Sequence, residues 1–190
     1  MSVTGFIILG LVAIAAVYLV TIYNNLVQLK HNVAKAWSNI DVLLKQRHDE
    51  LPKLVETCKQ YMGYEQQTLE KVMQARAAVF SARERGDVKA LGPAEQELRI
   101  GLGNLFAVAE NYPDLKASDS FQHLQGRITG LENAIADRRE FYNESVNSLN
   151  VRIEQFPDVI VARNLGFKPA DLLVFSDEEK QDVDLKALFG

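Results

Sequence analysis

The sequence predicts an all-α protein, in which an N-terminal transmembrane helix continues into an elongated antiparallel bundle of three to four helices. Three observations carry this prediction. No charged side chain precedes Lys30. Beyond that point, apolar residues recur at steps of three and four, the spacing of one face of a helix. Clusters of proline and glycine divide this pattern into a few long segments.

Residues 3–22 form the predicted membrane span. About 20 apolar residues, rising about 1.5 Å each, match the roughly 30 Å hydrocarbon core of a bilayer. A signal peptide would begin with basic residues, which are missing here, although Ala13-Ile14-Ala15 resembles a cleavage site. A core helix would have a polar face, whereas this segment is apolar all round. We therefore interpret it as a retained anchor, with Tyr18 and Tyr23 at the membrane interface.

Charge and cysteine content limit the possible partners, the compartment and the membrane orientation of the protein. The net charge is −4 and the chain has no dense patch of Lys and Arg, which argues against nucleic acid as a partner. The single cysteine, Cys58, cannot form an internal disulfide and fits a reducing compartment. Lys30 and Lys35 follow the anchor while no basic residue precedes it, so the positive-inside rule places the N-terminus outside and the bundle in the cytoplasm.

The anchor is expected to run without a break, through Asn24 and Asn25, into one long amphipathic helix. Gly86 marks its end, because glycine is the preferred residue just past a helix. Pro52 interrupts this helix, and an interior proline removes a backbone hydrogen bond at a cost of about 3 kcal/mol or more. A kink is favoured over a new helix capped by Asp49, because the apolar stripe keeps its register across Pro52.

Local signals place the remaining elements. The next helix is predicted to start at Leu91-Gly92-Pro93, with Pro93 at the first helical position, and to run to about Tyr112. Pro113 then breaks it. Ser118 or Asp119 caps a third helix with a nearly strict heptad pattern, which ends at Phe156-Pro157. Residues 159–165 are expected to add a short helical turn closed by Gly166.

From Pro169 the chain is interpreted as a tail. Its apolar residues at 172–175 are expected to dock on the bundle or on a neighbouring copy, and Asp177-Glu178-Glu179 to be solvated. The predicted domains are therefore an anchor at residues 1–23, a bundle at 24–166, and a partly docked, acidic tail at 167–190.

Six residues are candidates for packing or for setting the register between helices: Asn24, Trp37, Pro52, Arg138, Tyr142 and Asn143. The motif Tyr23-Asn24-x-x-Val27 recurs as Tyr142-Asn143-x-x-Val146. If the recurrence is structural, each ring lies on the packing face with an amide beside it, where Asn can fix register; a chance match is favoured. Arg138 occupies a position where the stripe calls for an apolar residue, and a snorkelling arginine is favoured over a buried one.

The sequence holds no recognisable set of catalytic or metal-binding residues. Its three histidines are scattered, and it lacks a phosphate loop, a dinucleotide-binding turn and a nucleophile elbow. We therefore expect no enzymatic activity, no cofactor and no metal. His48-Asp49-Glu50 is the densest ionisable cluster and is interpreted as solvated helix surface. Cys58 lies on the apolar stripe and is interpreted as a core residue.

Four segments of the sequence resemble a known family. YNNLVQLKHNVAKAWSNIDVLLKQRHDELPKLVETCKQYMGYE is similar to the opening block of LemA proteins, and AENYPDLKAS, FQHLQGRITGLENAIADRREFYNESVNSLN and FPDVIVARNLGF are similar to its remaining blocks. The resemblance extends from the anchor to Phe175. It implies a bacterial single-pass membrane protein with an elongated antiparallel helical bundle and an external N-terminus, and it brings no catalytic residues.

These observations favour a membrane-anchored, non-catalytic helical scaffold of the bacterial inner membrane. Its expected partners are the lipid bilayer, further copies of the chain and other membrane proteins, and not nucleic acid. A coat-like membrane-remodelling protein is one alternative, but it needs a second membrane contact and the sequence has no strongly basic amphipathic face. An accessory subunit of a membrane protease complex is another, and the sequence does not separate it from the scaffold.

Overall fold

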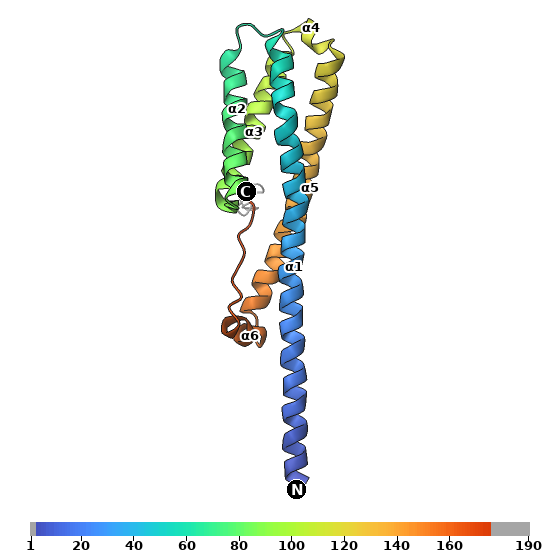
Figure 1. The fold of residues 1–190 in the computed structure, drawn as a ribbon, viewed down its shortest axis with the longest axis vertical. Helices are drawn as coiled ribbons and strands as arrows, with labels where there is room; N and C mark the ends of the chain where they lie inside the picture. Colours follow the sequence, from blue (N-terminus) through green and yellow to red (C-terminus); the bar gives the residue numbers. More distant parts are fainter. Residues whose placement is uncertain (1–2, 176–190) are drawn as a thin grey trace, which may run out of the picture. The chain divides into compact units, whose positions relative to one another are not determined.

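A computed structural model describes residues 3–175, which form six helices and no strand (Figure 1). The helices are α1 Val3–Lys59, α2 Gln66–Glu84, α3 Val88–Ala109, α4 Pro113–Lys116, α5 Asp119–Glu154 and α6 Asp158–Asn164. The all-α prediction is confirmed. The acidic residues 177–179, which the sequence analysis predicts to be solvated, lie outside the described residues.

The described chain folds into two compact units. Unit 1 contains the residues up to Ser38 together with Phe141–Asp171, and unit 2 contains Asn39–Glu140 together with the described residues from Leu172 onward. Unit 1 thus holds the apolar N-terminal stretch, the end of α5 and α6. Unit 2 holds the later part of α1, the helices α2, α3 and α4, and α5 up to Glu140.

Helix α1 passes through Asn24 and Asn25 without interruption, so the predicted continuity of the anchor with the first bundle helix is confirmed. It also contains Pro52, as expected of one helix rather than a new one. The predicted end near Gly86 is wrong for this helix, because α1 ends at Lys59 and a turn at residues 60–65 leads into α2. Apolar residues keep helical spacing on both sides of the turn, so the stripe by itself did not reveal the break at Gly63.

Helices α1 and α2 pair in antiparallel fashion within unit 2. Arg83 donates to Asp41, and Arg76 contacts His48, so residues later in α2 meet residues earlier in α1. Helix α2 ends at Glu84, where Gly86 adopts a left-handed φ of 63° that glycine tolerates. This is the predicted glycine stop.

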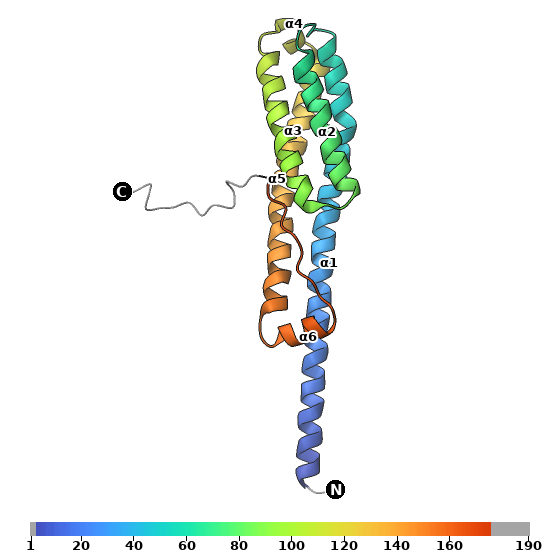
Figure 2. The same cartoon turned by 90° about the vertical axis from the view of Figure 1, so that its left-hand side faces the viewer.

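Helix α3 lies beside α2 (Figure 2) and starts earlier than predicted. The Asp87 side chain accepts a hydrogen bond from the Ala90 backbone N–H, which caps the helix, and Pro93 lies inside it. The prediction of Pro93 at the first helical position is therefore wrong, because an N-cap aspartate directly after the glycine stop starts the helix sooner.

The predicted break after α3 is confirmed, and Pro113 begins the short helix α4 there. The Ser118 hydroxyl then accepts from the Phe121 backbone N–H, 3.5 Å away, as expected of a cap for α5. Helix α5 ends at Glu154, ahead of Phe156-Pro157, and α6 follows, closed by Gly166 with a φ of 72°. These ends were set by local residue chemistry and were predicted correctly.

Candidate functional site

The N-terminal part of α1 exposes its apolar side chains on every side. All residues from 6 to 21 are exposed, and α1 contains a window long and apolar enough to cross a membrane, of which 6% is buried. A buried core helix is therefore not the explanation for this stretch. Tyr18 and Tyr23 are both exposed and lie at and just beyond its end, and their assignment to the membrane interface stays a prediction.

Directly after this stretch, unit 1 forms its own small core. Counting from Val3, Ile22 and Leu26 of α1 are the first buried residues that the structure describes, and they pack in a cluster with Leu149 and Ile153 of α5 and with Val161 and Ala162 of α6. The Tyr23 ring meets the Phe167 ring edge-on, with centroids 6.3 Å apart. Helices α5 and α6 therefore hold α1 at the point where its exposed apolar stretch ends.

Farther along unit 1, the two aromatic candidates meet. The rings of Trp37 and Tyr142 lie 5.7 Å apart, and the Tyr142 hydroxyl donates to the backbone carbonyl of Asp171 at 2.9 Å. Burial raises the pKa of Tyr142, with Asp171 adding to the effect, so the hydroxyl keeps its proton and acts as a donor. Asn143 is half-buried beside this pair, whereas Asn24 is exposed, so the two Tyr-Asn motifs do not occupy equivalent environments.

Asn150 is a structural residue of unit 1 that the sequence reasoning missed. Its amide donates to the Ala170 carbonyl and its side-chain oxygen accepts from the Ala170 N–H, both at 2.9 Å. This pair of bonds fastens the chain after α6 to α5. Asparagine next to the apolar positions Leu149 and Ile153 was the available signal.

Replacing Asn150 by alanine should lower the free energy of unfolding of unit 1 by about 1–3 kcal/mol, because both Ala170 backbone groups lose their partner. Fluorescence of Trp37, the single tryptophan, can follow urea unfolding of this unit. Asn147→Ala is the matched control, since Asn147 is exposed on the same helix. Equal midpoints for the two variants would contradict the assigned role.

In unit 2, the most buried charged residue is Arg47 of α1, which is 1% exposed. Its guanidinium donates to Glu95 of α3 and to Glu132 of α5, and thus joins three helices. Burial disfavours its charge, but the two carboxylates outweigh burial and raise the pKa of Arg47, so the guanidinium stays charged. Burial raises the pKa of Glu95, with Arg47 opposing. This cluster was not predicted, because a lone Arg in a helix normally marks a solvated face.

Arg138 is exposed, as the favoured snorkelling interpretation expects, and the neighbouring residue Arg139 takes the inward place. The Arg139 guanidinium lies over the Phe175 ring, 4.1 Å from its centroid. Such a cation–π contact stabilises both groups. The heptad count was off by one residue here, because α-helices drift relative to a strict heptad.

Phe175 belongs to residues 172–175, a segment that lies on α3 in unit 2. Leu173 and Phe175 are buried, and the Val174 backbone passes so close to Gly92 that a Cβ atom there would lie 1.9 Å from the Val174 carbonyl oxygen. Gly92 is therefore needed for this close approach rather than for a helix start.

Pro52 has an identifiable compensation in unit 2. Lacking an N–H, it leaves the carbonyl of His48, four residues earlier, without its helical partner. Arg76 of α2 supplies one: its Nε donates to the His48 carbonyl at 2.9 Å. The same guanidinium contacts the His48 ring nitrogen Nε2 at 2.7 Å, and the ring stacks on Phe80. The interpretation of His48 as solvated surface is therefore wrong, because α2 folds back over it.

Unit 2 should lose stability in mild acid through His48. Burial and then the Arg76 charge lower the pKa of His48 below its usual 6.5, with Asp49 opposing and Arg83 adding. The unfolded chain therefore binds the proton more tightly, so the free energy of unfolding falls as pH drops below about 6.5. Urea midpoints from circular dichroism should show this slope, and His48→Gln should reduce it. His123→Gln, at an exposed position of α5, should keep it; an unchanged slope in His48→Gln would contradict the assignment.

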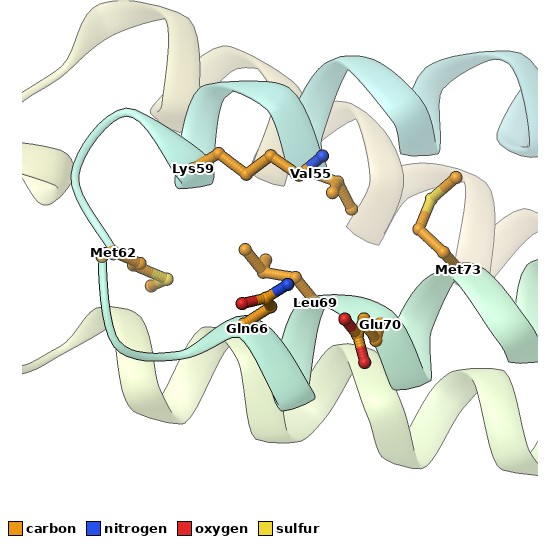
Figure 3. A pocket seen from close by; sticks show the side chains of 8 residues that line it. Val55, Lys59, Met62, Gln66, Leu69, Glu70 and Met73 are labelled. Atoms are coloured by element: carbon orange, nitrogen blue, oxygen red, sulfur yellow. The ribbon is translucent and has the colours of Figure 1, made fainter.

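Cys58 is fully buried, which confirms its interpretation as a core residue. Burial raises the pKa of its thiol to about 11. Near it, a pocket of about 350 Å³ opens between the end of α1 and the start of α2 (Figure 3). Val55, Met62, Leu69 and Met73 supply apolar lining, and Lys59, Gln66 and Glu70 supply polar groups. Within residues 3–175, no group of His, Cys, Asp and Glu is arranged to hold a metal ion.

The sequence of this chain is similar to a protein family and to several individual proteins. The model of the LemA family matches residues 36–186. Magnetosome protein MamQ 2 of Paramagnetospirillum magneticum is 27% identical over 187 residues, covering 86% of this chain and 68% of the relative. Magnetosome protein MamQ of Magnetospirillum gryphiswaldense is 25% identical over 184 residues, covering 85% and 67%. Protein LemA of Metamycoplasma hominis is 29% identical over 167 residues, covering 87% and 74%.

Proposed function

Because the chain belongs to the LemA family, we propose that it is a membrane-anchored helical scaffold of the bacterial inner membrane, which self-associates and catalyses no reaction. Family membership and the apolar stretch of α1 together indicate a membrane-associated helical protein. The proposal goes beyond that statement in three respects: the scaffold role, the self-association and the location in the inner membrane.

One observation carries the proposal. The exposed apolar stretch and the first buried residues, Ile22 and Leu26, belong to the same uninterrupted helix, and α5 and α6 pack on that helix directly after the stretch. A flexible tether would let the soluble part rotate freely about its anchor. A helix clamped at this point instead ties the orientation of unit 1 to that of the span, which suits a protein that positions neighbours on a membrane.

Mass photometry of the full-length protein in detergent, over a series of concentrations, tests self-association. We expect species of several chains that persist on dilution. A monomer at every concentration would overturn the self-association and leave the anchor untouched.

Orientation is tested separately, and we expect the bundle on the cytoplasmic side. Tyr64 lies in the turn between α1 and α2 and is 98% exposed, so Tyr64→Cys in a Cys58→Ala background offers one accessible thiol. A maleimide that does not cross membranes should label it in inverted vesicles and not in intact spheroplasts. The opposite labelling pattern would reverse the proposed orientation.

A coat-like remodelling role is the second candidate, favoured by the exposed apolar side chains near α6, Phe156 and Ile160. It predicts that the reconstituted protein deforms liposomes. Vesicles that keep their shape in electron micrographs at high protein density would dispose of it.

A further inference from the structure

Three large apolar side chains stand exposed in and around α6 of unit 1: Phe156 in the turn before the helix, Ile160 within it and Leu165 directly after it. Phe156 is 77% exposed, Ile160 52% and Leu165 56%. We call these three residues the α6 corner. The opposite side of α6 is buried, since Val161 and Ala162 pack in the core around Ile22 and Leu26. Phe156 and Ile160 are thus left uncovered beside an element whose inner side holds α1, and Leu165 lies at the edge of a groove next to Tyr23.

The register of α1 against α5 gives the level of the corner along α1. Trp37 meets Tyr142, and the two helices run in opposite directions, because Ile22 and Leu26 meet Leu149 and Ile153. Both helices rise about 1.5 Å per residue. Fifteen residues from Trp37 lead back to Ile22, and twelve from Tyr142 lead to Glu154, the end of α5, with Phe156 two residues on in the turn. Phe156 therefore lies level with the end of the exposed apolar stretch, as Figure 2 shows for α6.

From this geometry we infer that the α6 corner is a second membrane contact, inserted into the boundary between headgroups and acyl chains of the bilayer that α1 crosses. The inference rests on the proposed function in one respect, that α1 spans the bilayer. Apolar side chains held at that level lie where membrane-bound segments bury about 5–10 Å deep. The bilayer is the occupant because the corner lies at the level where the exposed apolar stretch of α1, the proposed span, ends.

The charges beside the corner fit a phospholipid surface. A groove of about 680 Å³ begins at Tyr23 and Leu165 and is lined farther on by Lys30, His31 and Lys168. Lysine side chains just above an apolar contact attract lipid phosphates. The contact is thus apolar with flanking positive charge, rather than a strongly basic amphipathic face.

A quenching experiment on the full-length protein tests this contact. In a Cys58→Ala background, Phe156→Cys carries an environment-sensitive fluorophore, and the protein is placed in nanodiscs of phosphatidylcholine and phosphatidylglycerol. A fraction of the lipid bears a nitroxide near the headgroup. Phe141→Cys is the matched control, because Phe141 is an exposed phenylalanine on α5 of unit 1, 52% exposed and about 20 Å along the helix from its end at Glu154. The Trp37 emission of both labelled proteins shows that unit 1 is folded.

We expect the nitroxide lipid to quench the probe at 156 at least about twofold more than the probe at 141. Equal quenching at the two positions would overturn the inference. So would a blue-shifted probe at 156 without quenching, which would mean that protein, another copy or a partner, covers the corner. Mass photometry of the same nanodiscs reports self-association independently, so failure of the lipid contact and failure of the scaffold proposal are distinguishable.

Discussion

Replacing Arg47 by methionine should lower the free energy of unfolding of unit 2 by about 3–5 kcal/mol. Methionine fills most of the space, but it leaves Glu95, which is 2% exposed, as a buried carboxylate without its guanidinium. A buried charge that loses its partner costs far more than the pair contributed when intact. Glu132 is less affected, since its side chain keeps 20% exposure and can turn toward water.

Cys58 offers the measurement, because the single thiol is fully buried in unit 2 and reacts only when that unit opens. Thiol labelling across a urea series should show a midpoint shifted far down for Arg47→Met. Arg138→Met is the matched control, an exposed arginine of the same unit, and should stay within about 0.5 kcal/mol of the parent. Adding Glu95→Leu to Arg47→Met should restore most of the loss. A double variant as unstable as the single one would contradict the orphaned-carboxylate explanation.

Replacing Gly92 by alanine should displace residues 172–175 from α3 and destabilise unit 2 by about 2–4 kcal/mol. The added Cβ would lie 1.9 Å from the Val174 carbonyl oxygen, a backbone atom that cannot swing aside like the end of a side chain. Moving this backbone exposes Leu173 and Phe175 and takes Phe175 away from Arg139. The loss is therefore mainly apolar burial.

Hydrogen exchange of the peptide that covers residues 172–175 checks this result directly, and we expect much faster exchange in Gly92→Ala. Gly103→Ala is the matched control in the same helix, where an added Cβ meets nothing within 4 Å. It should stabilise α3 slightly, by up to about 1 kcal/mol, because alanine is the better helix former. Unchanged exchange in Gly92→Ala would show that the segment accommodates the methyl group without leaving α3.

Most helix ends of this protein were readable from short stretches of sequence. Gly86 and Gly166 stop helices because the left-handed conformation suits them, and Ser118 caps α5 because its hydroxyl reaches an unpaired N–H. The apolar stretch before Ile22 was readable for a similar reason, since length and the absence of charge are properties of the segment itself. The resemblance of four segments to LemA proteins independently implied the same all-α fold.

Several features followed only from the way helices meet in three dimensions. The turn at residues 60–65 was hidden because α2 continues the apolar spacing of α1 while running back along it. Arg47 is buried because Glu95 and Glu132, from helices far apart in sequence, enclose its guanidinium, and no local pattern around Arg47 indicates this. Gly92 is small because a backbone more than eighty residues away passes over it.

The sequence by itself thus determined the all-α class, the apolar span and most helix ends, because each depends on the residue's own chemistry and its close neighbours. The tertiary structure decided which charge is buried, which glycine is indispensable and which apolar side chains stay uncovered beside α6. Those properties depend on contacts with segments that are distant in sequence. Helical periodicity does not indicate which distant segment packs against a given residue.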